Sequence, residues 1–142
     1  MKESGTREVT IDIRATRERV WQAMTDPTLT REYFYGTDIV SDWKAGSRWT
    51  SESDGNVSLE GKIIEIDPPR RLVQTFHVRD DDPAASDDPS IVTLELTPVG
   101  DSTRLHLVHE GQGEATMAYT DGGWEYILTG MKDLLEGSSD SS

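Results

Sequence analysis

The chain has 142 residues, the length of one ordinary domain, and no cysteine, which excludes disulfides and cysteine-based metal sites. Its 27 acidic residues outnumber the 14 lysines and arginines, so the formal net charge is −13. A surface with this charge repels phosphate backbones and anionic lipids. We therefore expect neither a nucleic-acid partner nor insertion into a membrane.

The sequence also contains no apolar run of the roughly 18 residues that a membrane-spanning helix needs. The N-terminal residues carry no apolar segment of the kind found in signal peptides. These two observations predict a cytoplasmic location.

The first elements along the chain are a strand and two short helices. Val9, Ile11 and Ile13 alternate with polar residues, which predicts a half-buried strand over residues 8–14. Thr16 is the predicted N-cap of a first helix, and Asp26 followed by proline predicts the start of a second one that ends near residue 34.

The middle of the chain is predicted to consist of strands. They cover residues 37–41, 47–53, 57–66, 71–79, 90–98 and 103–110. Hairpin turns are predicted at residues 54–56 and 99–102. The acidic segment 80–90 is too polar and proline-rich to pack, so we expect a mobile loop there. It lacks the spaced acids of a calcium-binding loop, which favours a solvated segment.

A long helix closes the predicted fold. Apolar residues recur at helical spacing and share one face: Met117, Trp124, Ile127, Leu128, Met131, Leu134 and Leu135. We expect the helix to begin at Asp121 and to end at Gly137, and residues 138–142 to be disordered. The prediction is one domain over residues 1–142, with an ordered core over residues 8–136.

These elements predict an α+β fold. Consecutive antiparallel strands leave one apolar face, and only the C-terminal helix is long and apolar enough to cover it. We therefore expect a helix-grip arrangement, in which a curved antiparallel sheet of about six or seven strands wraps around the C-terminal helix. Two short helices follow the first strand.

Several local patterns resemble one known family. Residues 20–27 read VWQAMTDP, residues 61–76 read GKIIEIDPPRRLVQTF, and residues 103–109 read TRLHLVH before a glycine and Trp124. In order and spacing, over about residues 8–136, they resemble the Hsp90-ATPase-activator-like (AHSA1-type) family of the START/Bet v 1-like (SRPBCC) superfamily. Phe34 and Phe76 depart from this pattern, since tryptophan is common at both positions.

The resemblance implies a deep pocket between the sheet and the last helix. Relatives bind lipids, sterols or other apolar small molecules there, and a minority are enzymes such as polyketide cyclases. The predicted ligand-binding residues are Phe34, Trp49, Phe76, Leu94, Leu107, His109, Trp124, Ile127, Leu128 and Met131. Ordinary core packing explains the same apolar residues, and sequence alone does not separate the two interpretations.

Polar candidates for catalysis or metal binding are few. His106 and His109 are three residues apart and so point to opposite faces of a strand, and His77 stands alone, which predicts no metal site. Of the three histidines, His109 is the one expected to face inward, and a hydrogen bond to a ligand or a buried water is one interpretation of it. Glu95 is expected to face outward, whereas the face of Glu60 is not decided.

No nucleophile, phosphate-binding or dinucleotide motif occurs, so we predict no catalytic residue and no cofactor. Three functions remain as hypotheses. The first is the binding of a small apolar or amphipathic ligand by a carrier, sensor or stress-related protein. The second is a cyclase- or hydrolase-like enzyme that uses a buried polar pair, for example His109 with Glu60 or Tyr126. The third is a chaperone-associated interaction module, or a homodimer, with an exposed apolar patch.

Overall fold

The computed structural model describes residues 5–79 and 82–140, with side chains as far as Gly137. Seven strands form one sheet: β1 (Gly5–Ile13), β2 (Asp38–Ser41), β3 (Arg48–Ser53), β4 (Asn56–Asp67), β5 (Arg71–Val78), β6 (Ser90–Val99) and β7 (Ser102–Gln112). The helices are α1 (Arg17–Thr25), α2 (Pro27–Tyr33), the 3-10 turn η1 (Pro83–Ser86), α3 (Glu114–Tyr119) and α4 (Gly123–Asp140).

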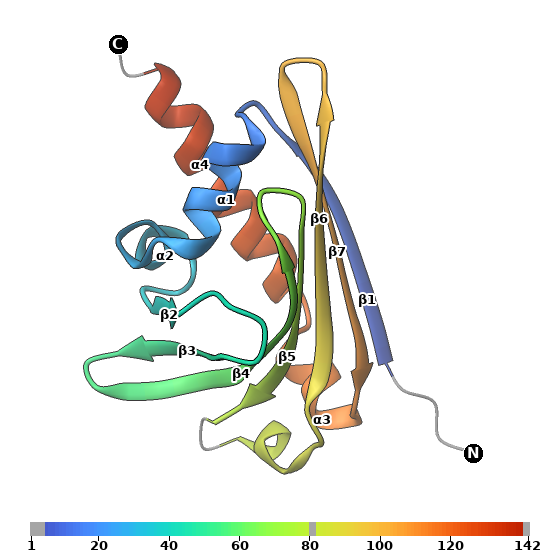
Figure 1. The fold of residues 1–142 in the computed structure, drawn as a ribbon. Coiled ribbons are helices and arrows are strands. Elements are labelled where there is room, and N and C mark those ends of the chain that lie inside the picture. Colours follow the sequence, from blue (N-terminus) through green and yellow to red (C-terminus); the bar gives the residue numbers. More distant parts are fainter. Residues whose placement is uncertain (1–4, 80–81, 141–142) are drawn as a thin grey trace.

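The strands follow the spatial order β1-β7-β6-β5-β4-β3-β2, and every neighbouring pair is antiparallel. Figure 1 shows β1, β6 and β7 running upright while β3 and β4 cross the view below the helices, so the sheet is strongly curved. The helices α1, α2 and α4 lie on the same side of it. The predicted α+β helix-grip arrangement is confirmed.

The predicted helix caps are also confirmed. The Thr16 hydroxyl accepts a hydrogen bond from the backbone N–H of Arg19 at 3.2 Å. The Asp26 carboxylate accepts one from the N–H of Thr28 at 2.9 Å, and Pro27 occupies the first turn of α2. Each cap satisfies an N–H group that the helix itself leaves without a partner.

Period-two alternation correctly predicts which strand residues face the helices. The even-numbered apolar residues of β6 and the odd-numbered residues of β7 are buried: Val92, Leu94, Leu96, Leu105, Leu107 and His109. The core lies between this inner face and α4.

Among the described residues, no helix has the length and apolar content needed to cross a bilayer.

Trp49 of β3 depends on a glycine in the neighbouring strand. It lies opposite Gly61 of β4, and its indole Nε1–H reaches past that strand to donate to the Thr75 carbonyl of β5 at 2.7 Å. A Cβ on Gly61 would lie 2.0 Å from the Thr75 oxygen and 2.3 Å from Trp49 Nε1. Only glycine leaves room for this contact.

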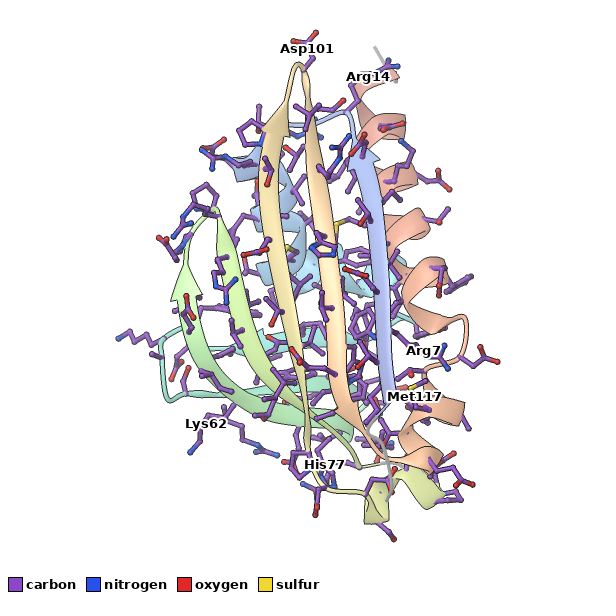
Figure 2. The ribbon with its side chains drawn as sticks, turned by 90° about the vertical axis from the view of Figure 1, so that its right-hand side faces the viewer. Arg7, Arg14, Lys62, His77, Asp101 and Met117 are labelled. Atoms are coloured by element: carbon purple, nitrogen blue, oxygen red, sulfur yellow. The ribbon has the colours of Figure 1, made fainter. Side chains whose placement is uncertain are left out.

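Met117, whose spacing groups it with the apolar face of the C-terminal helix, lies in a separate helix. The helix α3 ends at Tyr119, the chain turns through Gly122 with a φ of +73°, and α4 begins at Gly123, two residues after the predicted N-cap Asp121. Arg7 of β1 donates to the Met117 carbonyl at 2.5 Å and holds α3 beside the sheet edge, as Figure 2 shows.

The other end of the C-terminal helix also differs from the prediction. The backbone of α4 continues to Asp140, past the predicted end at Gly137. Gly137 does not adopt the left-handed conformation that would terminate a helix there. Residues 141 and 142 of the predicted disordered tail lie outside the described residues.

The prediction that the acidic segment does not pack is wrong for residues 82–90. Ala84 of η1 has no exposed surface, and the Asp87 carboxylate accepts hydrogen bonds from both the N–H and the hydroxyl of Thr116, each at 2.8 Å. His77 of β5 lies within 3.0 Å of the Ala85 carbonyl. Residues 80 and 81 lie outside the described residues, and the mobility of the segment stays a prediction.

We expect Gly61→Ala to destabilise the fold by about 2 kcal/mol or more, since the new methyl group meets backbone atoms that cannot move without opening the sheet. Urea denaturation followed by tryptophan fluorescence measures the loss. Gly137→Ala is the matched control, because nothing lies within 4 Å of its Cβ and alanine favours a helix. Equal stability of both variants would contradict the steric role of Gly61.

Candidate functional site

The main pocket opens between the start of α4, the segment after α2 and the inner face of the sheet. Its volume is about 240 Å³. It is lined by Phe34, Tyr35, Thr37, Ser51, Ser58, Leu59, Phe76, Tyr119, Thr120, Gly123, Trp124 and Ile127. An apolar protein cavity of about 150 Å³ holds a benzene molecule, so this first pocket has room for a somewhat larger ring system.

A second, smaller pocket of about 50 Å³ lies farther along α4. Phe34, Trp124 and Ile127 line both pockets, so the two pockets adjoin along these side chains. The rest of the second lining is Met24, Tyr33, Ile39, Trp43, Trp49, Leu72, Gln74, Leu94, Leu128 and Met131.

Eight of the ten residues predicted to bind a ligand line one of these pockets. Phe76 lines the first, and Trp49, Leu94, Leu128 and Met131 line the second, in addition to the three shared residues. Leu107 and His109 belong to neither lining, although both are fully buried. The structure thus places them behind the pocket walls.

Sequence reasoning missed the polar part of both linings. Gln74 stands between Leu72 and Phe76 on one face of β5, so the alternation of that strand already indicates an inward side chain. Tyr35 gives no such signal, because it follows α2 with a φ of +55°, in a conformation that a sequence pattern does not reveal.

His109 holds Trp124 in place. The indole Nε1–H donates to His109 Nδ1 at 2.9 Å, so this ring nitrogen carries no proton. The proton therefore sits on Nε2, which lies 2.7 Å from the Ser90 hydroxyl, and Ser90 in turn donates to the Phe76 carbonyl at 3.3 Å. The chain of bonds fixes an aromatic wall shared by the two pockets.

The same geometry excludes a serine–histidine dyad at this position. A general base must accept the serine proton, but Nε2 of His109 already carries one. Burial, with a smaller effect from the Arg7 charge, lowers the pKa of His109 to about 3, so the ring is neutral near pH 7.

Glu60 faces outward and lies among cations. Its carboxylate is 2.7 Å from Arg48 and 3.0 Å from Arg79, and it lies 3.6 Å from His77. Partial burial opposes its charge, but the hydrogen bonds from the two arginines outweigh this and lower the pKa of Glu60. The pair of His109 with Glu60 is not formed, and Tyr126 stacks on Tyr35 instead of approaching His109.

The described lining of both pockets contains no Asp, Glu, Lys, Arg or His. In the first pocket two of the hydroxyl hydrogens are used within the protein: Ser51 donates to Thr37 at 2.7 Å, and Thr37 donates to the Phe34 carbonyl at 2.7 Å. Nor does any group of three or more His, Cys, Asp or Glu side chains within the described ranges fit a metal ion. The walls therefore suit a neutral, largely apolar molecule.

Comparison with known proteins agrees with this architecture. The family model for the activator of Hsp90 ATPase homolog 1-like protein matches residues 14–136. The chain belongs to this family. The resemblance inferred from the sequence motifs is confirmed, while a search of curated proteins found no match.

Solved structures share the fold over most of the chain. Protein MLL2253 from Mesorhizobium loti is 28% identical, with a TM-score of 0.73 over 92% of this chain and 97% of that one. CalU16 from Micromonospora echinospora is 26% identical, with a TM-score of 0.72 over 90% of this chain and 74% of that one. PFC0360w, an HSP90 activator from Plasmodium falciparum, is 23% identical, with a TM-score of 0.74 over 93% of this chain and 96% of that one. At this identity the likeness shows the fold alone.

We expect acid to destabilise the protein through His109. Its folded pKa of about 3 lies below the ordinary value of 6.5, so its stabilising contribution is present above pH 6.5 and is lost as the pH falls towards 3. From about pH 7.5 to about pH 5, the free energy of unfolding should fall by about 2 kcal/mol more than in His109→Gln.

Urea denaturation at a series of pH values measures this difference. The control His106→Gln keeps His109 and its bond to Trp124. Its free energy of unfolding should therefore still show the fall with pH that is due to His109. If the free energies of unfolding of the wild type and His109→Gln change with pH in parallel, His109 does not resist protonation in the folded state.

Proposed function

We propose that this family member binds a small, neutral, apolar or amphipathic molecule in the pocket between the curved sheet and α4. One observation carries the proposal: a pocket of about 240 Å³ whose described wall is mostly apolar and holds no charged side chain. A charged ligand would lose its hydration there without gaining an ionic partner, whereas a neutral apolar ligand gains by leaving water.

The aromatic walls of the pocket support the same proposal. Phe34, Phe76 and Trp124 surround it with aromatic faces, and the rings of Phe34 and Phe76 lie 6.1 Å and 6.0 Å from that of Trp124. Large flat walls of this kind bury much ligand surface with little loss of side-chain freedom, because aromatic side chains have few rotatable bonds.

A second candidate function is an interaction with a chaperone. Tyr35 and Tyr126 are 60% and 63% exposed, and their rings stack at 5.2 Å with an interplanar angle of 17°. They line an open groove of about 660 Å³ together with Glu32, Glu125 and Asp133. Exposed aromatic pairs next to acidic side chains suit a partner surface that carries lysine or arginine.

The charge of the groove also bears on the homodimer hypothesis. A two-fold dimer through this groove would bring the same three acidic side chains of both copies together, which is unfavourable for a chain of net charge −13. A basic partner has the complementary charge. The name of the family suggests Hsp90 as the partner to test first.

For the first candidate, we expect Gly123→Leu to fill the main pocket. A Cβ at Gly123 meets only the Tyr35 hydroxyl, at 3.5 Å, so a leucine fits there, and it also favours the helix. Naphthalene should bind the wild type, and the variant should bind it at least about tenfold more weakly. Isothermal titration calorimetry measures both affinities.

Gly137→Leu is the matched control, since it makes the same change on α4 away from both pockets. It should leave naphthalene binding unchanged. Equal affinities of the two variants would place the ligand outside the main pocket. If neither naphthalene nor a broad panel of neutral apolar compounds binds the wild type, the proposal fails.

For the second candidate, we expect the protein to raise the rate of ATP hydrolysis by purified Hsp90. The double variant Tyr35→Ser and Tyr126→Ser should reduce the stimulation, and added salt should weaken it because the contact is electrostatic. Val99→Ser is the control, since it removes an exposed apolar side chain at the distant β6–β7 turn. A rate unchanged by the wild-type protein would rule out this function.

A further inference from the structure

Gln74 is a buried polar residue whose amide oxygen has no hydrogen-bond partner. Its side chain is 8% exposed, and it stands on the inner face of β5 between Leu72 and Phe76. Within the described part of the chain, its Oε1 is the one buried side-chain oxygen or nitrogen without a partner. Burying an acceptor in this state destabilises a fold, so its presence in the wall of a pocket points to a ligand.

The other polar groups of the second pocket do not serve Gln74. The Tyr33 hydroxyl donates to the Ala23 carbonyl at 2.7 Å, and the Trp49 indole donates to Thr75 at 2.7 Å. The Trp124 indole donates to His109 at 2.9 Å. A buried water makes about three hydrogen bonds, and with the donors of Tyr33, Trp49 and Trp124 committed elsewhere the wall offers a water few partners. A hydrogen-bond donor on a ligand fits the site better.

The two pockets lie one after the other along the same elements. On β5, Phe76 lines the first pocket and Gln74 the second; on β3, Ser51 lines the first and Trp49 the second. These residues are two apart on their strands, which is a step of about 6.6 Å along the cavity. On α4, Gly123 lines the first pocket, and Leu128 and Met131 line the second.

A molecule held in the first pocket therefore points one end at Gln74 when it extends past Phe34, Trp124 and Ile127. We propose that the second pocket is the anchoring end of the binding site, and that Gln74 Oε1 accepts a hydrogen bond from a hydroxyl or N–H group at the inner end of an otherwise apolar ligand. This inference rests on the proposed ligand-binding function and specifies the class of ligand.

A carboxylate at this end has no ionic partner in the described wall. A carboxylate would set its negative charge against the amide oxygen, and no described lining residue of the second pocket carries a positive charge to offset it. The ligand class is thus a neutral alcohol, phenol or N–H compound, and not a fatty acid.

The test compares 2-naphthol with 2-methylnaphthalene, which has nearly the same shape but no hydrogen-bond donor. The wild type should bind 2-naphthol about tenfold more tightly by isothermal titration calorimetry, because the wall already meets the apolar surface of both compounds. Gln74→Met should abolish this preference while keeping the affinity for 2-methylnaphthalene, since methionine matches glutamine in size.

Gln74→Met should also raise the melting temperature of the ligand-free protein, because it removes an acceptor that lacks a partner. Leu94→Met is the control, since it changes another wall residue of the same pocket and leaves Gln74 in place. It should retain the preference for 2-naphthol.

The outcomes separate the two proposals. In one outcome, the wild type binds 2-methylnaphthalene, Gly123→Leu weakens this binding, and the wild type does not prefer 2-naphthol. The role of Gln74 is then wrong, while the ligand-binding function stands. A preference for 2-naphthol that survives Gln74→Met equally overturns the role of Gln74. If neither compound nor any of the neutral panel binds the wild type, both proposals fail.

Discussion

One long helix, α4, and two short ones, α1 and α2, cover the inner face of a seven-stranded curved sheet, and the pockets follow from this constraint. At the C-terminal half of α4, Met131 and Leu135 are joined by residues of α1 and α2, such as Val20 and Tyr33, in one close-packed core. At the N-terminal half, α4 faces β3, β4 and β5 with only Tyr119 of the short helix α3 contributing to the same described lining, and the side chains leave about 240 Å³ between them. The cavity is therefore the part of the sheet that the helices do not fill.

Two buried polar side chains of this core have opposite relations to their surroundings. Both ring nitrogens of His109 have partners, and its pKa of about 3 keeps the ring neutral, so it acts as a rigid support for Trp124. Gln74 has a comparable burial but leaves its oxygen unpaired. Buried polar groups that stabilise a fold are satisfied within it, whereas an unsatisfied one needs a partner from outside the chain.

Those elements whose signal is local were predictable from the sequence. The strands over residues 90–98 and 103–110 have one buried and one exposed face, so their alternation predicts both the strands and their inward residues. Thr16 and Asp26 cap helices through their own side chains, which sequence reasoning also detects. These patterns also gave the order of the elements, and the family motifs then supported the helix-grip fold that this order indicates.

The remaining features depend on contacts between distant segments. Residues 82–90 look solvated by composition, yet they pack because Asp87 meets Thr116 and Ala84 is enclosed. Met117 has helical spacing relative to Trp124, but the backbone turn at Gly122 separates their helices. The sequence also did not distinguish apolar residues that line a pocket from those that fill the core. Leu107 and Phe76 are both apolar, and only the three-dimensional arrangement places Phe76 at a pocket.

The main pocket and the outer groove are connected through Tyr35. This side chain lines both of them, and its hydroxyl is the atom nearest to a Cβ added at the first residue of α4. A ligand in the pocket and a partner in the groove would both contact Tyr35, so each would favour the position of the ring that suits it. By thermodynamic linkage, any effect of the ligand on partner affinity must equal the effect of the partner on ligand affinity. The two proposed functions therefore share one residue, because Tyr35, in a left-handed backbone conformation, lines both surfaces.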